Sequence, residues 1–383
     1  MGLNFVFKIY LSYHIDKSDI GIFYTFMDMV SIGVMVFAGF KDSLIRAFDR
    51  DNFQNILYWY SYIFWGLSAI VLTIELIYYH FSHFKYPVYT LVSILFFNLL
   101  SIFLSYLNAS FKGYKIMLFE NLIQALGVIL SFTILSQYID NIDALIYAFI
   151  LSFIVKIIYI WLFSPIQWDK HSSEIKEVKP FITNTLFSSG MYFLSGFFIS
   201  MSSLVILNLF DDIDFLSEFQ IVIKSIFFSL VAVFVYPLNS FTFPQLSKLI
   251  SEKQIGEILR IEQKFKRYLI VFFILIILGS FFTKFIIAMV FPKEYIGGYF
   301  YLNLMLPLLP FIAYTTFALN IIKGFDRFDL ALYVRLLGSV VFFISVFIFY
   351  LLDFEASCVV YSLDMSFLAM FILVFYYKKR LLL

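Results

Sequence analysis

Apolar runs of about twenty residues, separated by short charged turns, follow one another along almost the whole chain. A helical crossing of a bilayer takes about 20 mostly apolar residues. Hydrophobic residues make up 62% of the 383 residues, and charged residues make up 14%. A water-soluble fold of this length cannot bury so much apolar surface. The composition predicts a polytopic membrane protein and excludes a soluble enzyme, a nucleic-acid-binding protein and a disordered chain.

Twelve such runs predict an all-α fold with about twelve transmembrane helices. They cover residues 3–13, 20–40, 56–79, 88–107, 116–135, 144–163, 186–209, 221–241, 269–290, 299–319, 330–351 and 356–376. The first run is about half as long as the others. It predicts either a truncated chain start or a native short helix that ends within the bilayer.

The distribution of Lys and Arg orients the predicted helices. If the N-terminus is cytoplasmic and every run crosses, the inner segments carry 19 basic residues and the outer turns carry 3. Cytoplasmic loops are enriched in Lys and Arg. If one helix had been missed, every loop after it would be assigned to the wrong side, and the basic residues there would fall on the outside. The distribution therefore predicts twelve crossings with cytoplasmic N- and C-termini. The inner residues are Lys41, Arg46, Arg50, Lys112, Lys115, Lys170, Lys176, Lys179, Lys248, Lys253, Arg260, Lys264, Lys266, Arg267, Lys323, Arg327, Lys378, Lys379 and Arg380, and the outer ones are Lys17, Lys85 and Lys293.

The loops after the fourth and tenth runs share a pattern. Each has a Lys-Gly pair preceded by an Asn, and a second glycine follows 14 residues after the first. The two sets are Asn108, Lys112, Gly113 and Gly127, and Asn320, Lys323, Gly324 and Gly338. This pattern predicts two six-helix bundles, residues 1–175 and 176–383. Because six is even, the two repeats are parallel, and a cavity between such repeats is typical of transporters.

Four segments, in this order along the chain, resemble one family of membrane transporters. They are 19–24 (Asp-Ile-Gly-Ile-Phe-Tyr), 39–46 (Gly-Phe-Lys-Asp-Ser-Leu-Ile-Arg), 219–244, with an internal lysine and Pro-Leu-Asn-Ser-Phe near its end, and 289–295 (Met-Val-Phe-Pro-Lys-Glu-Tyr). Over essentially its whole length the chain resembles the polysaccharide flippase branch, of the O-antigen (Wzx) type, of the multidrug/oligosaccharidyl-lipid/polysaccharide exporter superfamily. The half-length first run departs from the full-length first helix of that family.

The resemblance implies that the protein flips an undecaprenyl-diphosphate-linked oligosaccharide across the bacterial cytoplasmic (inner) membrane. The flipping would proceed by alternating access and serve the synthesis of O-antigen, lipopolysaccharide or another surface polysaccharide. The implied partners are this lipid-linked substrate, membrane lipids and the polysaccharide polymerase machinery. Composition and spacing alone indicate only a twelve-helix transporter.

Two other functions stay open. One is a cation-coupled multidrug exporter of the same superfamily, for which an acid-dominated cavity is expected. The other is a membrane-embedded polysaccharide polymerase or ligase. Such enzymes usually carry a large periplasmic loop, whereas every predicted outer turn of this chain is short.

Polar groups inside the predicted spans are the candidate functional residues, because an ionisable group costs roughly 2.5 to 3.5 kcal/mol at a helix centre. A diphosphate headgroup requires fixed cations, and a lysine ten residues past Asp214 lies near mid-membrane. An arginine just below the second predicted helix lies where a diphosphate would enter from the cytoplasm. The predicted substrate-binding residues are Lys8, Arg46, Gln124, Lys224 and Arg335.

Three acids, Asp28, Glu120 and Asp364, are predicted to couple transport to an ion or to form ion pairs. Asp28 and Lys8 lie about equally far from the first outer turn, so we expect them either to form a buried ion pair or to bind substrate or a proton. Glu120 shares a helix face with Gln124 at i, i+4 spacing.

The remaining charged residues of the spans carry no predicted function. Lys156 is expected to snorkel to the inner surface, and Glu75 and Lys284 are expected to lie inertly near interfaces. Segment 247–268 has helical periodicity and predicts an amphipathic helix on the inner surface. No P-loop, nucleophile–base constellation or metal-ligand spacing occurs, and Cys358 is the only cysteine. The sequence therefore predicts no enzyme activity, cofactor, metal or nucleic-acid partner.

Overall fold

The computed structural model describes residues 2–47, 53–82, 84–110, 114–164, 178–325 and 327–382. All regular structure in these residues is helical, and none of it is a strand. The predicted all-α polytopic fold class is therefore confirmed. The chain packs as two compact units. The first unit is Phe23–Met201, and the second unit combines Met1–Ile22 with Ser202–Leu383.

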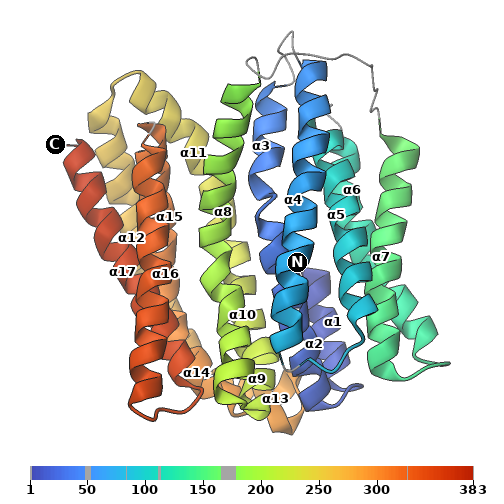
Figure 1. The fold of residues 1–383 in the computed structure, drawn as a ribbon. Helices are drawn as coiled ribbons and strands as arrows, with labels where there is room; N and C mark the ends of the chain where they lie inside the picture. Colours follow the sequence, from blue (N-terminus) through green and yellow to red (C-terminus); the bar gives the residue numbers. More distant parts are fainter. Residues whose placement is uncertain are drawn as a thin grey trace. The chain divides into compact units, whose positions relative to one another are not determined.

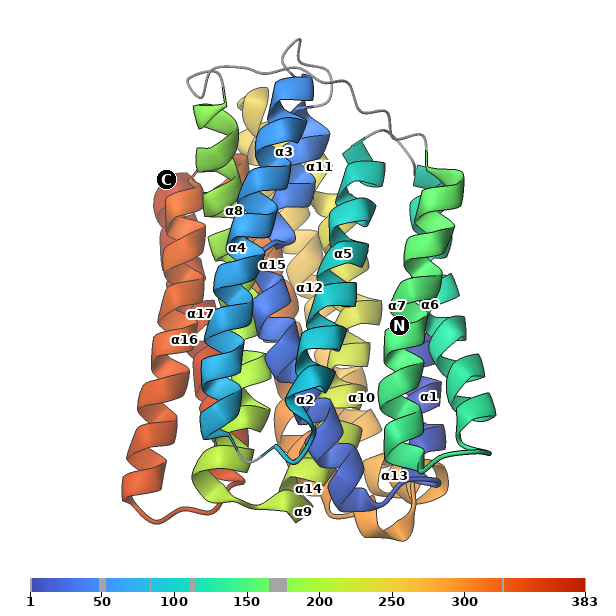
Figure 2. The ribbon, with the colours of Figure 1, turned by 45° about the vertical axis from the view of Figure 1, so that its right-hand side comes forward.

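The first unit is organised around α5. Its helices are α3 (Ala38–Ala47), α4 (Phe53–Phe81), α5 (Val88–Ser110), α6 (Tyr114–Leu135) and α7 (Asn141–Phe163), with most of α2 (Lys17–Met35) and of α8 (Lys179–Val205). α5 packs against α3, α4, α6 and α7, and α6 packs along α7. Both ribbon views show α5, α6 and α7 side by side (Figure 1 and Figure 2).

The second unit is organised around α15, which packs against α11, α12, α16 and α17. The short α1 packs against η3 and α10 of this unit. Its elements are α1 (Gly2–Ser12), η2 (Ile206–Phe210), α9 (Ile213–Glu218), η3 (Phe219–Ile223), α10 (Lys224–Leu230), η4 (Val231–Val235), α11 (Tyr236–Ser251), α12 (Ile255–Ser280), α13 (Thr283–Val290), η5 (Lys293–Tyr295), α14 (Gly298–Met305), η6 (Leu306–Leu308), α15 (Leu309–Gly324), α16 (Phe328–Leu351) and α17 (Cys358–Leu382).

A helix or a helical series lies at each of the twelve predicted runs. In the described residues, nine helical segments are long and apolar enough to cross a membrane, and α12 with α13 forms a tenth that is bent by 60°. Two apolar helices are shorter, α1 and the Phe119–Leu135 part of α6. The half-length first run is thus confirmed as an 11-residue helix. Full crossings at α1 and α6 stay a prediction.

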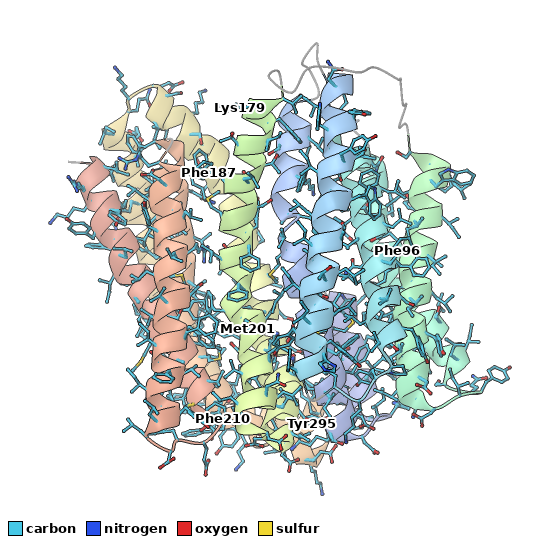
Figure 3. All side chains as sticks on the ribbon, viewed as in Figure 1. Phe96, Lys179, Phe187, Met201, Phe210 and Tyr295 are labelled. Atoms are coloured by element: carbon cyan, nitrogen blue, oxygen red, sulfur yellow. The ribbon has the colours of Figure 1, made fainter. Side chains whose placement is uncertain are left out.

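Within the second unit, predicted outer turns meet at one end and predicted inner segments meet at the other, as the charge distribution predicted. At one end Lys17 contacts Asp214 and lies over the Tyr295 ring, which joins three predicted outer turns. At the other end Lys378 contacts Glu262, which joins two predicted inner segments. Figure 3 shows Tyr295 at the same end of the unit as Phe210, the last residue of η2. The cytoplasmic location of the inner ends stays a prediction.

The separate surface helix predicted for 247–268 is wrong. Residues 247–251 end α11, and a continuous helix, α12, then runs from Ile255 to Ser280. The buried residues Ile258, Glu262 and Phe265 follow at i, i+4 and i+7. The periodicity in the sequence is therefore that of the inner end of a long helix packing on its neighbours, rather than that of a helix lying on a membrane surface.

Three π-helical turns widen the helical series between residues 206 and 235, and the sequence analysis predicted none of them. They are η2, η3 and η4. In a π turn each N–H bonds to the carbonyl five residues back, and such turns occur frequently at functional sites. They leave no periodicity signal because each is only five residues long.

A glycine lets two helices of the first unit touch. A Cβ atom at Gly39 of α3 would lie 2.3 Å from the backbone nitrogen of Ser189 and 2.7 Å from the backbone oxygen of Thr185, both on α8. Backbone atoms cannot rotate away from such a clash. Gly66 of α4 is a matched contrast, since nothing lies within 4 Å of the Cβ that it lacks.

We predict that Gly39→Ala lowers stability by about 1 to 3 kcal/mol, because the helices must separate to admit the methyl group. Gly66→Ala should instead stabilise α4 by roughly 0.5 to 1 kcal/mol. Thermal unfolding of the purified variants in detergent, with membrane yield measured in parallel, checks both effects. Equal midpoints for the two variants would contradict the close approach of α3 and α8.

Candidate functional site

A lysine of the first helix reaches the widened part of the eighth predicted span. Lys8 Nζ donates a hydrogen bond to Ser225 Oγ over 3.0 Å and to the backbone oxygen of Gln220 over 3.4 Å. The residues lie 217 and 212 positions apart in the sequence. A half-buried ammonium group is thereby held against polar atoms of a helix that is otherwise apolar.

The π turn η3 makes the backbone oxygen of Gln220 accessible to this lysine. In an α-helix the Lys224 N–H would bond to Gln220, four residues back, but in η3 it bonds to Phe219, five residues back. The Gln220 oxygen instead accepts from Ser225 Oγ over 2.8 Å and from Lys8. The π turn thus makes the Gln220 backbone carbonyl part of a polar site.

Lys224 is half-buried and is the first residue of α10, directly before Ser225. Two of the predicted substrate-binding residues, Lys8 and Lys224, therefore lie on adjoining segments of one unit. We call Lys8, Gln220, Lys224 and Ser225 the lysine site. At 1.5 Å per residue, Lys8 lies about 6 Å from the end of α1 at Ser12, and Lys224 lies about 15 Å past Asp214.

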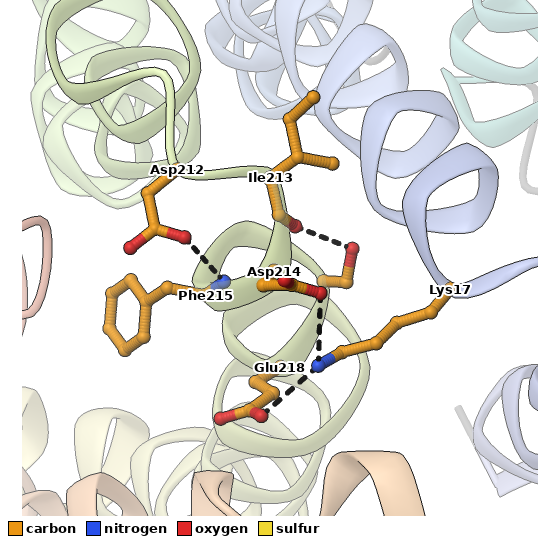
Figure 4. Close-up of polar contacts among 7 residues, drawn as sticks. Lys17, Asp212, Ile213, Asp214, Phe215 and Glu218 are labelled. Carbon is orange, nitrogen blue, oxygen red and sulfur yellow. Dashed lines mark hydrogen bonds and ion pairs between the residues drawn. The ribbon is translucent and has the colours of Figure 1, made fainter.

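An ion-paired cluster joins these outer turns, and we call it the outer seam (Lys17, Gly21, Asp214, Ser217 and Glu218). Lys17 Nζ lies 3.2 Å from Glu218 Oε1 and 3.5 Å from Asp214 Oδ1 (Figure 4). The side chains of Lys17 and Glu218 are about 15% exposed, whereas Asp214 is 91% exposed, so the Glu218 contact is the less screened of the two. A Cβ at Gly21 would lie 2.2 Å from Ser217 Oγ, so α2 and α9 touch here.

The turn at 292–297 also packs against the outer seam. A Cβ at Gly297 would lie 2.8 Å from a Glu218 carboxylate oxygen, and Lys17 Nζ lies 5.7 Å from the centre of the Tyr295 ring. Burial, and then the carboxylates of Glu294 and Glu218, raise the pKa of the Tyr295 phenol, which therefore stays neutral. A polar cavity of about 550 Å³ lies beside the seam, lined by residues 12–17 and 292–294.

The sequence analysis missed the outer seam. It treated Lys17 only as one of three basic residues in acidic turns, and it did not consider Glu218. The available signal was Lys17 itself, because an isolated cation in a set of acidic turns indicates a local partner. Which acid it meets depends on helix packing that no sequence spacing encodes.

Arg335 and Asp364 lie on the packed helices α16 and α17. Arg335 is half-buried, and its Nη1 lies 3.9 Å from the sulfur of Met370. Asp364 is also half-buried, and its Oδ1 is buried without a hydrogen-bond partner among the described residues. Their roles in substrate binding and ion coupling stay predictions.

In the first unit, Glu120 is 3% exposed and accepts a hydrogen bond from Ser105 Oγ. The buried Lys156 donates to Asn121 Oδ1 over 3.4 Å and interacts electrostatically with Glu120. The expectation that Lys156 snorkels to the surface is wrong, because polar groups on α6 hold it inside the unit. Gln124, one turn along α6 from Glu120, is half-buried.

Glu75 was expected to lie inertly near an interface, and its side chain is 6% exposed within the first unit. One of its oxygens would lie 2.0 Å from a Cβ at Gly33, so the carboxyl group packs directly onto α2. Neither oxygen has a hydrogen-bond partner among the described residues. Asp28 of α2 is half-buried. An Asp28–Lys8 pair stays a prediction.

Two other predictions concern single side chains. Arg46 lies in α3, and its side chain lies outside the described part of the structure. Lys284 of α13 is exposed and lies 5.3 Å from the centre of the Tyr299 ring. Among the described residues, no group of three or more His, Cys, Asp or Glu side chains is arranged to hold a metal ion.

A second buried ionic cluster lies at the inner end of the second unit, and we call it the Glu262 network. Glu262 Oε1 accepts from Lys378, from Lys266 at 2.7 Å and from the Tyr314 hydroxyl at 2.7 Å. The side chains of Glu262 and Lys378 are 3% and 6% exposed. The network ties α12, α15 and α17 together, and the sequence analysis missed it because it placed 247–268 outside the bundle.

Comparison with known proteins gives the fold. No protein-family model and no curated protein matches the sequence. Among solved structures, an inward-facing multidrug resistance MATE family transporter of the MOP superfamily superposes with a TM-score of 0.73 at 13% identity, covering 99% of this chain and 94% of that one. The lipid II flippase MurJ, in an inward closed conformation, gives a TM-score of 0.74 at 14% identity over 98% and 85%. The chain has the fold of these transporters.

A further MOP superfamily transporter, from Pyrococcus furiosus, superposes with a TM-score of 0.65 at 12% identity, covering 99% of this chain and 91% of that one. These neighbours are transporters and a flippase rather than enzymes. The likeness confirms the predicted transporter architecture with two repeats. The boundary between repeats at 175 and 176 stays a prediction.

We predict that Glu262→Ala destabilises the protein by about 3 to 5 kcal/mol, because it leaves the buried Lys378 ammonium group without its carboxylate. The matched control is Glu257→Ala on the same helix, since Glu257 pairs with Arg260 at 3.6 Å and both side chains are more than half exposed. We expect no measurable change for the control. Thermal unfolding in detergent compares the two variants, and similar midpoints would show that the network contributes little.

Proposed function

We propose that this protein flips an undecaprenyl-diphosphate-linked oligosaccharide across the bacterial cytoplasmic membrane for the synthesis of O-antigen or another surface polysaccharide. The lysine site carries this proposal. Lys8 of the short helix α1 and Lys224 at the start of α10 bring two cationic residues to adjoining segments of the second unit. A diphosphate is the one strongly anionic part of such a substrate, and lysine side chains would bind it.

The energetics of the lysine site support binding of an anion. A lysine near mid-membrane is costly unless it meets polar groups, water or an anion. Two of the groups that Lys8 contacts, the Ser225 hydroxyl and the Gln220 backbone oxygen, are neutral acceptors. A passing diphosphate would supply negative charge, and each charge-assisted contact contributes about 1.5 to 3 kcal/mol.

The outer seam supports a mechanism of alternating access. It joins predicted outer turns about nine residues from Lys8 along α1–α2 and about six to ten residues from Lys224 along α9–α10. A substrate leaving the lysine site toward the outside would require Lys17 to separate from Asp214 and Glu218. Solved structures with this fold include inward-facing and outward-facing MATE transporters.

The remaining parts of the proposal follow from the predicted orientation. Both termini would be cytoplasmic, and Arg46 and Arg335 would assist substrate entry and passage with Gln124. Asp28, Glu120 and Asp364 would either couple flipping to the movement of an ion or form ion pairs within the protein. The partners would be the lipid-linked oligosaccharide, membrane lipids and the polysaccharide polymerase machinery.

A cation-coupled multidrug exporter is a second candidate function, and the buried acids favour it. Glu75, Glu120 and Asp364 each have a buried carboxylate oxygen without a hydrogen-bond partner among the described residues. MATE transporters share the fold. Complementation of a flippase-deficient strain, scored by surface polysaccharide, separates the two functions from each other when drug susceptibility is measured in the same cells. Restored polysaccharide supports flipping, and drug resistance without polysaccharide supports export.

We predict that Lys224→Gln and Lys8→Gln each reduce surface polysaccharide synthesis about tenfold or more, because each removes one charge-assisted contact with the diphosphate. Lys224→Arg should retain part of the activity, since it keeps the charge. Lys284→Gln is the matched control, because Lys284 is exposed on α13. Polysaccharide per molecule of membrane-inserted protein is the measurement. Wild-type activity of Lys224→Gln at a normal protein level would remove the lysine site from the mechanism.

We predict that a cross-link across the outer seam stops transport. Lys17→Cys with Asp214→Cys, in a Cys358→Ala background, is treated with a short cleavable bifunctional thiol reagent. Transport should fall to background because the outer turns cannot separate, and it should return when the linker is cleaved. Each single cysteine variant treated with the same reagent is the control. Undiminished transport in fully cross-linked protein would exclude opening at this seam.

A further inference from the structure

An apolar groove lies on the surface of the second unit, where α12, α15 and α17 meet. Its volume is about 380 Å³, within the range of small-molecule sites. Its walls are formed by aliphatic and aromatic side chains, namely Leu269, Ile270, Phe273, Phe311, Phe371 and Phe375. Ile270 is 61% exposed and Phe375 is 42% exposed, so the groove is open along its length.

The Glu262 network closes one end of this groove and carries surplus positive charge. A single carboxylate, Glu262, faces two ammonium groups, those of Lys266 and Lys378. Lys378 is buried, whereas the Lys266 side chain is 45% exposed and lines the groove. The third partner, Tyr314, contributes a neutral hydroxyl that bonds to both Glu262 and Lys378. A net charge of about +1 therefore lies at this end of the apolar groove.

The predicted span places this part of α12 at a membrane interface. Lys266 lies one turn before the predicted span, and Leu269 and Phe273 lie in its first two turns. Tyr268, between them, is 72% exposed, which is typical of tyrosine at the headgroup level. Lys266 and Phe273 are about 10 Å apart along the helix axis. The groove thus leads from the headgroup region into the hydrocarbon.

We propose that this groove binds an anionic phospholipid of the inner leaflet, with the phosphate on Lys266 and one acyl chain lying along Leu269, Ile270 and Phe273. Basic pockets between transmembrane helices on the cytoplasmic side are suited to anionic lipid headgroups. A neutral lipid would match only the apolar wall, and a free phosphate would match only the ammonium group. An anionic lipid matches both and is supplied by the bilayer itself. This site does not depend on what the protein transports.

The experiment is native mass spectrometry of the full-length protein with phosphatidylglycerol or phosphatidylcholine of identical acyl chains. The wild-type protein should retain more phosphatidylglycerol than phosphatidylcholine. In Lys266→Gln the ratio of the two retained lipids should fall about fivefold, because one Lys near the headgroup contributes roughly this factor. Lys266→Arg should keep the preference. In Lys266→Gln, Lys378 and Tyr314 still bond to Glu262, so the helices stay tied together.

Two further variants separate a built site from general attraction. Lys264→Gln is the matched control, because Lys264 is an exposed lysine two residues away that does not line the groove. Leu269→Trp fills the groove and should weaken retention of both lipids while leaving a lysine at its end. A thermal midpoint in detergent is measured for every variant, so that loss of lipid is not confused with unfolding.

Several results would overturn the proposal. Equal loss in Lys264→Gln and Lys266→Gln would indicate a diffuse basic surface. Equal retention of the two lipids by the wild-type protein would indicate an apolar groove alone. Displacement of phosphatidylglycerol by glycerol phosphate at equal concentration would indicate a free-phosphate site, and stronger displacement by a polyprenyl phosphate would assign the groove to that lipid class instead.

Discussion

The cost of placing charge in the membrane interior is the constraint on which the arrangement of this chain depends. Each such group costs roughly 2.5 to 3.5 kcal/mol at a helix centre. Lys8 meets the Ser225 hydroxyl, and Lys156 meets the Asn121 side-chain oxygen. Because apolar side chains gain little by packing on each other rather than on lipid, these polar contacts specify which helices are neighbours within each unit.

Much of the fold was predictable because its main determinant is local. Runs of apolar residues bounded by charge identify each helix, and the distribution of Lys and Arg assigns alternate ends, which the contacts within the second unit reproduce. The three π turns and the 60° bend between α12 and α13 were not predictable. They arise from how a helix accommodates its neighbours. One extra residue in a single turn does not alter the hydrophobic periodicity of the sequence enough to be detected.

For the candidate site, the sequence predicted only how far each residue lies from the outer end of its helix. Counting residues from the outer turns placed Lys8 and Lys224 at similar levels, and the structure brings their segments together. Contacts between neighbouring helices cannot be predicted by counting residues along one helix. The distance of Glu75 from a helix end does not reveal that α2 covers it at Gly33. Glu218 was missed because its partner is about two hundred residues away in the sequence.

The π turns give the helical series from 206 to 235 a freedom that a regular α-helix lacks. A wide turn migrates along a helix when one N–H exchanges the carbonyl five residues back for the one four residues back. Each exchange rotates the residue that the turn passes by about 100° around the axis. Lys224 and Ser225 are consecutive and directly follow η3. Migration of η3 by one residue would therefore turn these two side chains toward a different face of the helix.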